Sequence, residues 1–157
     1  MPEGKTYEKF SSLIAKLADK YKGPVFSPHV TLIGDIRDDN VFYKAERLSK
    51  HMKPFTIKLT KATYVNDYYR CIIVMAEQTG YILNPAWKAR DIFANYNKRK
   101  YIPHLSLFYG NLDEKKKKEI VNSLENVNSE FLVDKIHLVD ATGKPENWNV
   151  IKTYPLT

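Results

Sequence analysis

Two short segments of the chain repeat one pattern, in which a histidine follows a proline and precedes a hydroxyl residue by two positions. The pattern occurs at His29 and Thr31 and again at His104 and Ser106. In an extended strand, side chains two positions apart point to the same face, so each imidazole lies beside a hydroxyl. If the two strands lie side by side, two imidazoles and two hydroxyls converge, a set suited to acid/base chemistry on a phosphate.

A single histidine in a strand is most often an ordinary half-buried residue with a backbone partner. The repetition of the whole pattern favours a functional pair instead. The other two histidines lack it: His51 is expected at the surface near the end of a helix, and His137 on the solvent face of a strand. The sequence shows no spaced cluster of metal ligands, no glycine-rich phosphate loop and no nucleophile elbow, so we expect neither metal nor cofactor.

The composition indicates a globular protein with anionic partners. The chain has 157 residues, enough for a substantial core, and a net charge of +7 from 25 basic and 18 acidic residues. Such an excess favours nucleotides or RNA as partners. For the run Lys98-Arg99-Lys100, the sequence supports two roles equally: a solvated surface segment and the steering of phosphates. Lys115 to Lys118 is interpreted as a solvated helix face.

Cysteine content and hydropathy indicate a cytoplasmic protein. Cys71 is the only cysteine, so no intrachain disulfide can form, and its apolar neighbours predict a small core residue rather than a nucleophile. No apolar stretch is long enough to span a bilayer, and the N-terminus lacks a secretory signal. We therefore expect a cytoplasmic location and no membrane partner.

Periodicity predicts an alternation of helices and strands. The predicted helices cover 6–21, with Thr6 as N-cap and Gly23-Pro24 as stop, then 41–52, a helix opened by Asn84-Pro85 and a helix capped by Asp113; the predicted strands cover both motifs, 55–60, 69–76, 131–139 and 149–154. The order helix, motif strand, helix, hairpin thus occurs twice. This duplication predicts an α+β fold of two lobes, related by an approximate two-fold axis, with the motif strands in a central groove.

Tyrosine is abundant, and Tyr109 lies five residues after His104 at the end of the second motif strand. By strict alternation Tyr109 falls on the face opposite His104, so it reaches the groove only through a bulge or a twist at the strand end. Aromatic rings near the groove are expected to stack on a nucleobase.

The segments Gly23 to Thr31 and Tyr101 to Tyr109, with a weaker echo in Glu146-Asn147-Trp148, resemble the cyclic phosphodiesterase-like family of the two-histidine phosphoesterase superfamily. The resemblance extends over nearly the whole chain. It implies one bilobal domain over residues 1–157, with two antiparallel sheets flanking a groove and helices outside. It also implies metal-independent hydrolysis of nucleoside 2′,3′-cyclic phosphates, or of ADP-ribose 1″,2″-cyclic phosphate.

By motif position, the resemblance assigns catalysis to His29 and His104, phosphate binding to Thr31 and Ser106, and a substrate contact to Tyr109. One imidazole would act as general base and the other as general acid, and the sequence does not assign the two roles. The expected partner of the monomeric chain is a small cyclic nucleotide. In the family an aromatic-bearing strand usually precedes the segment that resembles residues 1–4, so the resemblance implies that this strand is missing or that another segment fills its place.

Two other functions are compatible with these residues. The first is an RNA-end cyclic phosphodiesterase or 2′-5′ RNA ligase of the same superfamily, which differs in the length of substrate accepted. The second is a noncatalytic basic domain that binds RNA, for which binding would be salt-sensitive and turnover absent. The second function leaves the two matched histidine-hydroxyl pairs unexplained.

Overall fold

The computed structural model describes residues 1–94 and 100–157 and has the predicted α+β composition. Its helices are α1 (Gly4–Tyr21), α2 (Val41–Ser49), α3 (Gly80–Ile92) and α4 (Glu114–Ser123), with two short 3-10 helices, η1 (Tyr68–Arg70) and η2 (Pro145–Asn147). Its strands are β1 (Phe55–Tyr64), β2 (Ile72–Ala76), β3 (His104–Phe108), β4 (Ser129–Val133), β5 (Lys135–Asp140) and β6 (Asn149–Pro155).

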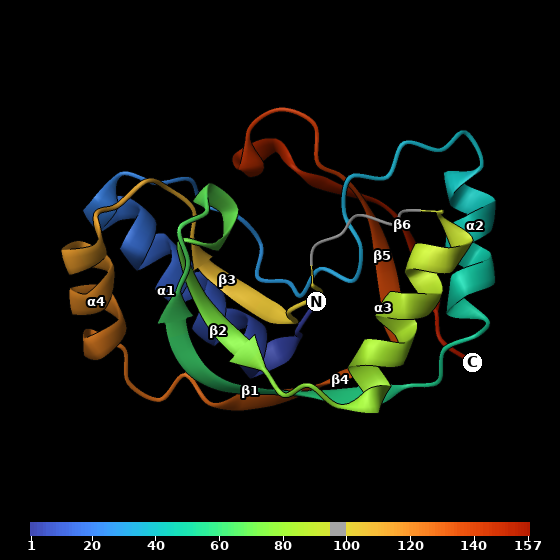
Figure 1. The fold of residues 1–157 in the computed structure, drawn as a ribbon, viewed down its shortest axis with the longest axis horizontal. Helices are drawn as coiled ribbons and strands as arrows, with labels where there is room; N and C mark the ends of the chain where they lie inside the picture. The colour runs from blue at the N-terminus through green and yellow to red at the C-terminus, as the bar shows by residue number, and fades with distance from the viewer. Residues whose placement is uncertain (95–99) are drawn as a thin grey trace.

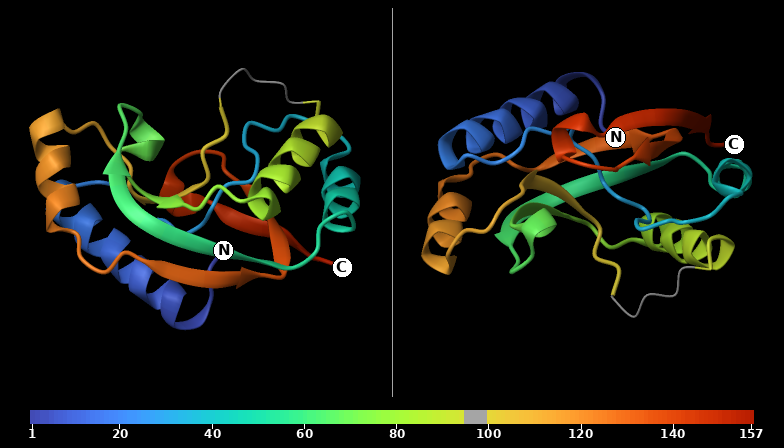
Figure 2. Two further views of the ribbon diagram at one scale, coloured as in Figure 1. Left: turned by 60° about the horizontal axis from the view of Figure 1, so that its bottom comes forward. Right: turned by 90° about the horizontal axis from the view of Figure 1, so that it is seen from above.

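The strands of the described residues form two antiparallel sheets of unequal size. The larger sheet has the order β3-β2-β1-β4, and the smaller one pairs β5 with β6. Helices α1 and α4 lie at one end of the molecule, while α2 and α3 lie together at the other (Figure 1). Figure 2 shows that β1 curls along the length of the molecule between these ends. The predicted pair of antiparallel sheets is thereby confirmed.

The core lies between α1 and the larger sheet. Phe10 and Ile14 of α1 are fully buried, as their helical spacing predicts, and they pack in one cluster with Val74 of β2 and Leu105 of β3. Burying an apolar side chain of this size contributes about 2 kcal/mol to folding. Cys71 is also fully buried, which confirms the prediction of a core cysteine.

Two helix starts and one helix end differ from the predicted positions. Helix α1 begins at Gly4 rather than after Thr6, and α3 begins at Gly80, so that Pro85 lies inside the helix rather than in its first turn. The earlier start of α3 places Ile82 in the core, where it is only 3% exposed. Burial of an apolar side chain therefore outweighs the local preference for proline near a helix start. Helix α2 ends at Ser49, three residues before the predicted end.

The predicted strand 131–139 is divided between the two sheets. Residues up to Val133 pair with β1, whereas residues from Lys135 onward pair with β6, and Asp134 lies between the two strands. The Asp134 carbonyl oxygen accepts a hydrogen bond from the Leu156 N–H at 2.8 Å. The predicted single strand therefore forms two strands in different sheets, because its pairing partner changes from β1 to β6 at Asp134.

One lysine of the run Lys115 to Lys118 is not solvated, contrary to the prediction. Lys117 is only 5% exposed, and its Nζ donates to Asn66 Oδ1 at 2.7 Å in the turn between β1 and η1. The predicted cap of this helix is confirmed, since the Asp113 carboxylate accepts a hydrogen bond from the Lys116 N–H at the start of α4. No helix within residues 1–94 and 100–157 is both long and apolar enough to cross a membrane.

Candidate active site

The second motif forms the strand that its sequence predicts. Strand β3 begins at His104, and its pairing with β2 places Met75 opposite His104 and Ile73 opposite Ser106. His104 and Ser106 therefore point to the same face of the larger sheet, as alternation requires. Ser106 is 4% exposed, while His104 is half-buried.

The first motif does not form the predicted strand. The chain is extended around His29, but only Val30 pairs with another strand, through an isolated antiparallel bridge to Leu105. The two motifs nevertheless lie next to each other, as predicted, because the bridge joins Val30 of the first motif to Leu105 of the second.

The register of this bridge decides which side chains meet. In an antiparallel pair, residues one step before and one step after the paired positions also lie opposite each other. With Val30 opposite Leu105, His29 lies opposite Ser106, and Thr31 lies opposite His104. Opposite residues share a face, so this register, extended by one residue on each side of the bridge, directs the two imidazoles and the two hydroxyls to one face. Each imidazole thus has the hydroxyl of the other motif across from it.

The two imidazoles are held in the same way. His29 Nδ1 lies 2.7 Å from the Ser27 carbonyl oxygen, and His104 Nδ1 lies 2.6 Å from the Ile102 carbonyl oxygen. A carbonyl oxygen can only accept, so each Nδ1 carries the hydrogen and donates it. The tautomer is therefore fixed, and the Nε2 atom of each ring is left to exchange protons with a substrate.

Burial lowers the pKa of both imidazoles below their usual value of 6.5. For His29 the removal of water is the largest cause, and the charge of the nearby His104 lowers its pKa further. For His104 burial is again the largest cause, and the Arg70 guanidinium lowers its pKa while the Asp67 carboxylate raises it. Both rings are therefore disposed toward the neutral form near pH 7 in the absence of an anion.

Arg70 is a site residue that the sequence pattern did not indicate. It lies in η1, and its Nη2 atom is 3.0 Å from Asp67 Oδ2. The influence of Arg70 on the pKa of His104 places a cation near the second imidazole. The sequence signal is weak, because an arginine three residues after an aspartate occurs in many turns with no role in chemistry.

Ser106 links β3 to η1 through its hydroxyl. Its Oγ donates to the Tyr69 carbonyl oxygen at 2.9 Å, and the Tyr109 hydroxyl lies close to the same side chain. To donate to a phosphate oxygen, the Ser106 hydroxyl has to rotate away from Tyr69.

A bulge in β3 brings Tyr109 to the face of Ser106. Ile73 lies opposite Ser106, but the preceding residue Ile72 lies opposite Phe108, so β3 contains one extra residue at Leu107. An extra residue reverses the alternation beyond it. Tyr109 therefore reaches Ser106 by the bulge that the sequence argument required. Burial raises the pKa of Tyr109, so its hydroxyl keeps its proton at physiological pH.

Aromatic rings from four parts of the chain surround His29. The Tyr109 ring stacks on Phe26 with centroids 3.8 Å apart, and Trp148, from the loop between β5 and β6, stacks on Tyr69 at 6.0 Å. The His29 ring lies 6.2 Å from Phe26 and 6.5 Å from Trp148. Trp148, from the hairpin of the smaller sheet, thus contacts both the His29 ring and Tyr69 of η1.

Several other predicted residues lie elsewhere. Lys98 and Arg99 fall outside the described residues. His51 is exposed, with Nδ1 2.6 Å from the Arg47 carbonyl oxygen, and His137 Nδ1 contacts Thr153 Oγ1 at 2.9 Å in the smaller sheet. Among residues 1–94 and 100–157, no three histidine, cysteine or acidic side chains are grouped to hold a metal ion.

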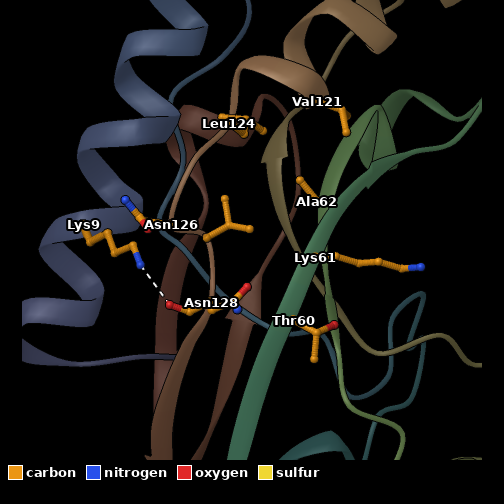
Figure 3. A pocket seen from close by; sticks show the side chains of 9 residues that line it. Lys9, Thr60, Lys61, Ala62, Val121, Leu124, Asn126 and Asn128 are labelled. Atoms are coloured by element: carbon orange, nitrogen blue, oxygen red, sulfur yellow. Dashed lines mark hydrogen bonds between the residues drawn. The ribbon is translucent and has the colours of Figure 1, made fainter.

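A separate open pocket of about 470 Å³ lies between α1, α4 and β1 (Figure 3). No residue of either motif lines it; its lining consists of Lys9, Thr60, Lys61, Ala62, Val121, Leu124, Asn126, Val127 and Asn128. Lys9 Nζ donates to the Asn128 carbonyl oxygen at 3.1 Å and to Ser129 Oγ at 2.8 Å. The pocket contains no imidazole or carboxyl group for acid/base chemistry.

Comparison with solved structures identifies similar folds. The chain superposes on the crystal structure of TT0787 of Thermus thermophilus with a TM-score of 0.64 and 18% identity, covering 95% of this chain and 92% of the other. It superposes on E. coli LigT complexed with 3′-AMP with a TM-score of 0.64 and 14% identity, covering 99% and 95%. A further LigT structure contains NADP+. At these identities the likeness establishes the fold alone.

Comparison of sequences identifies the family. A curated relative, the cyclic phosphodiesterase of Arabidopsis thaliana, is 24% identical over 120 residues, which make up 75% of this chain and 66% of the relative. The match thus spans slightly less than two thirds of the relative's length. The family model described as cyclic phosphodiesterase-like protein matches residues 1–156. The chain therefore belongs to the cyclic phosphodiesterase-like family.

Proposed function

We propose that this protein hydrolyses cyclic phosphodiesters of small nucleotides by two-histidine acid/base catalysis without a metal ion. The substrates would be nucleoside 2′,3′-cyclic phosphates, giving 2′-phosphates, and ADP-ribose 1″,2″-cyclic phosphate, giving the 1″-phosphate. The observation that supports the proposal is the Val30–Leu105 bridge, whose register, extended by one residue on each side, would direct two imidazoles and two hydroxyls to one face. Membership of the cyclic phosphodiesterase-like family supports the reaction class.

The proposed reaction is an in-line attack of water on the cyclic phosphorus. Nε2 of one imidazole takes a proton from the attacking water, and Nε2–H of the other gives a proton to the departing ribose oxygen. One P–O bond forms and one P–O bond breaks, and the proton removed by the base balances the one given by the acid. For a nucleoside 2′,3′-cyclic phosphate the departing atom is the 3′ oxygen, which leaves the phosphate on the 2′ position.

In this proposal, the side chains around the two imidazoles stabilise the negative charge of the phosphate. Thr31 and Ser106 would donate to the non-bridging oxygens as their negative charge grows, and Arg70 would lie beside the same charge. Tyr109, whose hydroxyl lies close to the Ser106 side chain, would contact the substrate. The anionic substrate raises the pKa of a neighbouring imidazole, so binding itself would supply the protonated acid.

The proposal predicts that replacing either motif histidine abolishes most of the activity. His29→Ala and His104→Ala should each lower kcat/KM for 2′,3′-cyclic AMP by about 10²–10⁴-fold, the usual contribution of a positioned acid or base. Assays in EDTA, with the product identified by 31P NMR, measure turnover, regiochemistry and metal dependence together. ADP-ribose 1″,2″-cyclic phosphate is assayed in parallel.

His51→Ala is the matched control, because His51 also contacts a backbone carbonyl through Nδ1 but lies at the surface. It should retain wild-type activity. Activity that survives both motif substitutions, or that disappears in EDTA, would contradict the proposed mechanism.

The length of the accepted substrate separates this function from its nearest alternative. An oligonucleotide ending in a 2′,3′-cyclic phosphate is compared with the mononucleotide at equal concentration. A higher kcat/KM for the oligonucleotide would favour an RNA-end phosphodiesterase or ligase. Salt-sensitive binding of RNA without turnover would favour a noncatalytic domain.

A further inference from the structure

The first motif forms no strand of either sheet. Among the described residues, Val30 pairs with β3 only through an isolated bridge to Leu105. The position of the His29 ring and the Thr31 hydroxyl relative to β3 therefore depends on contacts besides strand pairing. A side chain that adds such a contact would influence the geometry of both groups.

Tyr101 supplies a contact of this kind. Its hydroxyl donates to the Thr31 carbonyl oxygen at 3.1 Å, and the two residues are 70 positions apart in the chain. Tyr101 also lies three residues before His104, in the segment that leads into β3. One side chain thus joins the backbone of the first motif to the segment that leads into the second.

The Tyr101 side chain is well suited to a fixed position. Its ring packs against the hydrophobic core, and burial raises the pKa of its hydroxyl, so that the group remains a neutral donor at physiological pH. An aromatic ring that is half-buried against the core has few accessible rotamers, which limits the movement of the hydroxyl.

We infer that Tyr101 is a positioning residue for the acid/base pair, because its hydroxyl fixes the backbone of the His29–Thr31 segment against β3. Its effect on catalysis rests on the proposed function, whereas its effect on the segment does not. Loss of the hydroxyl would leave every group that touches the substrate in the protein but would allow the first motif to move. A displacement of about 1 Å at a reacting group can lower a rate by about 10²-fold.

Tyr101→Phe tests this inference, and Tyr154→Phe is its matched control. Tyr154 is 3% exposed, and its hydroxyl donates to the Phe42 carbonyl oxygen at 3.0 Å, so the same kind of bond is lost in the smaller sheet. Both substitutions keep the ring and its packing. Amide hydrogen exchange followed by NMR, together with kcat and KM for 2′,3′-cyclic AMP, is measured for both variants and the wild type.

In Tyr101→Phe the protected amides within residues 29–31 should exchange about fivefold faster, as expected for the loss of one intramolecular hydrogen bond. The value of kcat should fall by about tenfold or more, while KM changes less. Tyr154→Phe should leave both the exchange of these amides and kcat at wild-type values.

Unchanged exchange in residues 29–31, or equal exchange in the two variants, would overturn the inference. Faster exchange with unchanged kcat would also overturn it, because the segment would then move without consequence for the reaction. If wild-type protein turns over none of the cyclic phosphates, the proposed function fails, and the exchange data still decide whether Tyr101 holds the segment.

Discussion

Each of the two imidazoles combines a fixed tautomer with a lowered pKa. The Nδ1 atoms of His29 and His104 are committed to backbone carbonyls, and burial disfavours the charged ring in both cases. A neutral Nε2 is an acceptor, which suits a general base. The proposed reaction needs the second ring protonated, and this requirement gives the activity its dependence on pH.

We predict that kcat/KM for 2′,3′-cyclic AMP has a bell-shaped pH profile with its maximum below pH 6.5. Activity rises as the base loses its proton and falls as the acid loses its own, and both pKa values in the free enzyme lie below the usual 6.5. The descending limb of the kcat profile should lie at higher pH, because the bound anion favours the protonated ring. Initial rates between about pH 4.5 and about 8.5 measure both profiles.

Arg70→Met supplies the control for this assignment. Removal of a neighbouring cation raises the pKa of His104. The limb of the pH profile that reports the titration of His104 should therefore move to higher pH. A maximum of kcat/KM well above pH 7, or profiles identical in the variant and the wild type, would contradict the assignment.

Two glycines enclose the end of β3. A Cβ atom added at Gly110 would lie 2.6 Å from Cε1 of Phe108, and one added at Gly23 would lie 2.3 Å from Cε2 of the same ring. Phe108 is 2% exposed and sits at the bulge that directs Tyr109. The absence of two side chains therefore allows α1, β3 and the loop after β3 to meet around one phenyl ring.

Gly110→Ala should destabilise the protein by about 1–3 kcal/mol, the usual cost of overpacking a buried site. Gly34→Ala is the matched control: Gly34 closes the first motif as Gly110 closes the second, but its added Cβ would meet only Thr31 Cγ2 at 3.9 Å. Denaturant unfolding of both variants measures the difference. Equal stability of the two variants would show that Phe108 can move without cost.

Local sequence patterns predicted the elements whose signals are local. The Asp113 cap, the start of α2 at Val41 and the hairpin of β1 and β2 follow from capping residues and from alternation within a few positions. The spacing of histidine and hydroxyl residues also predicted that two motifs would meet, because both patterns alternate in the same phase.

The features that the sequence did not predict depend on contacts between residues far apart in the sequence. Lys117 is buried and donates a hydrogen bond to Asn66, and Arg70 lowers the pKa of His104 from η1, which contacts β3. The change of sheet at Asp134 is set by the pairing of β4 with β1 and of β5 with β6. None of these contacts has a signal within one window of sequence, so pattern analysis could not place them.

At the scale of the whole molecule, the excess of basic residues would attract the proposed anionic substrates. The net charge is +7, and the proposed substrates are phosphate anions. An electrostatic contribution of this kind acts on the encounter between the two partners and not on the chemical step.

We therefore predict that kcat/KM falls severalfold as salt is raised from about 20 mM to about 200 mM, while kcat changes little, because added ions shorten the range of the attraction. Steady-state kinetics across this range measure both values. An uncharged osmolyte at the same osmolality is the control and should leave kcat/KM unchanged. Equal responses to salt and osmolyte would contradict the electrostatic explanation.

The bulge at Leu107 also determines where the protein can change length during evolution. Deletion of one residue from β3 would restore regular alternation and turn Tyr109 to the opposite face, away from Ser106. The loop between β5 and β6 consists mainly of exposed residues before Trp148, and extra residues there would alter no strand register. Insertions and deletions tolerated by natural selection should therefore accumulate in that loop and be absent from the five positions of β3.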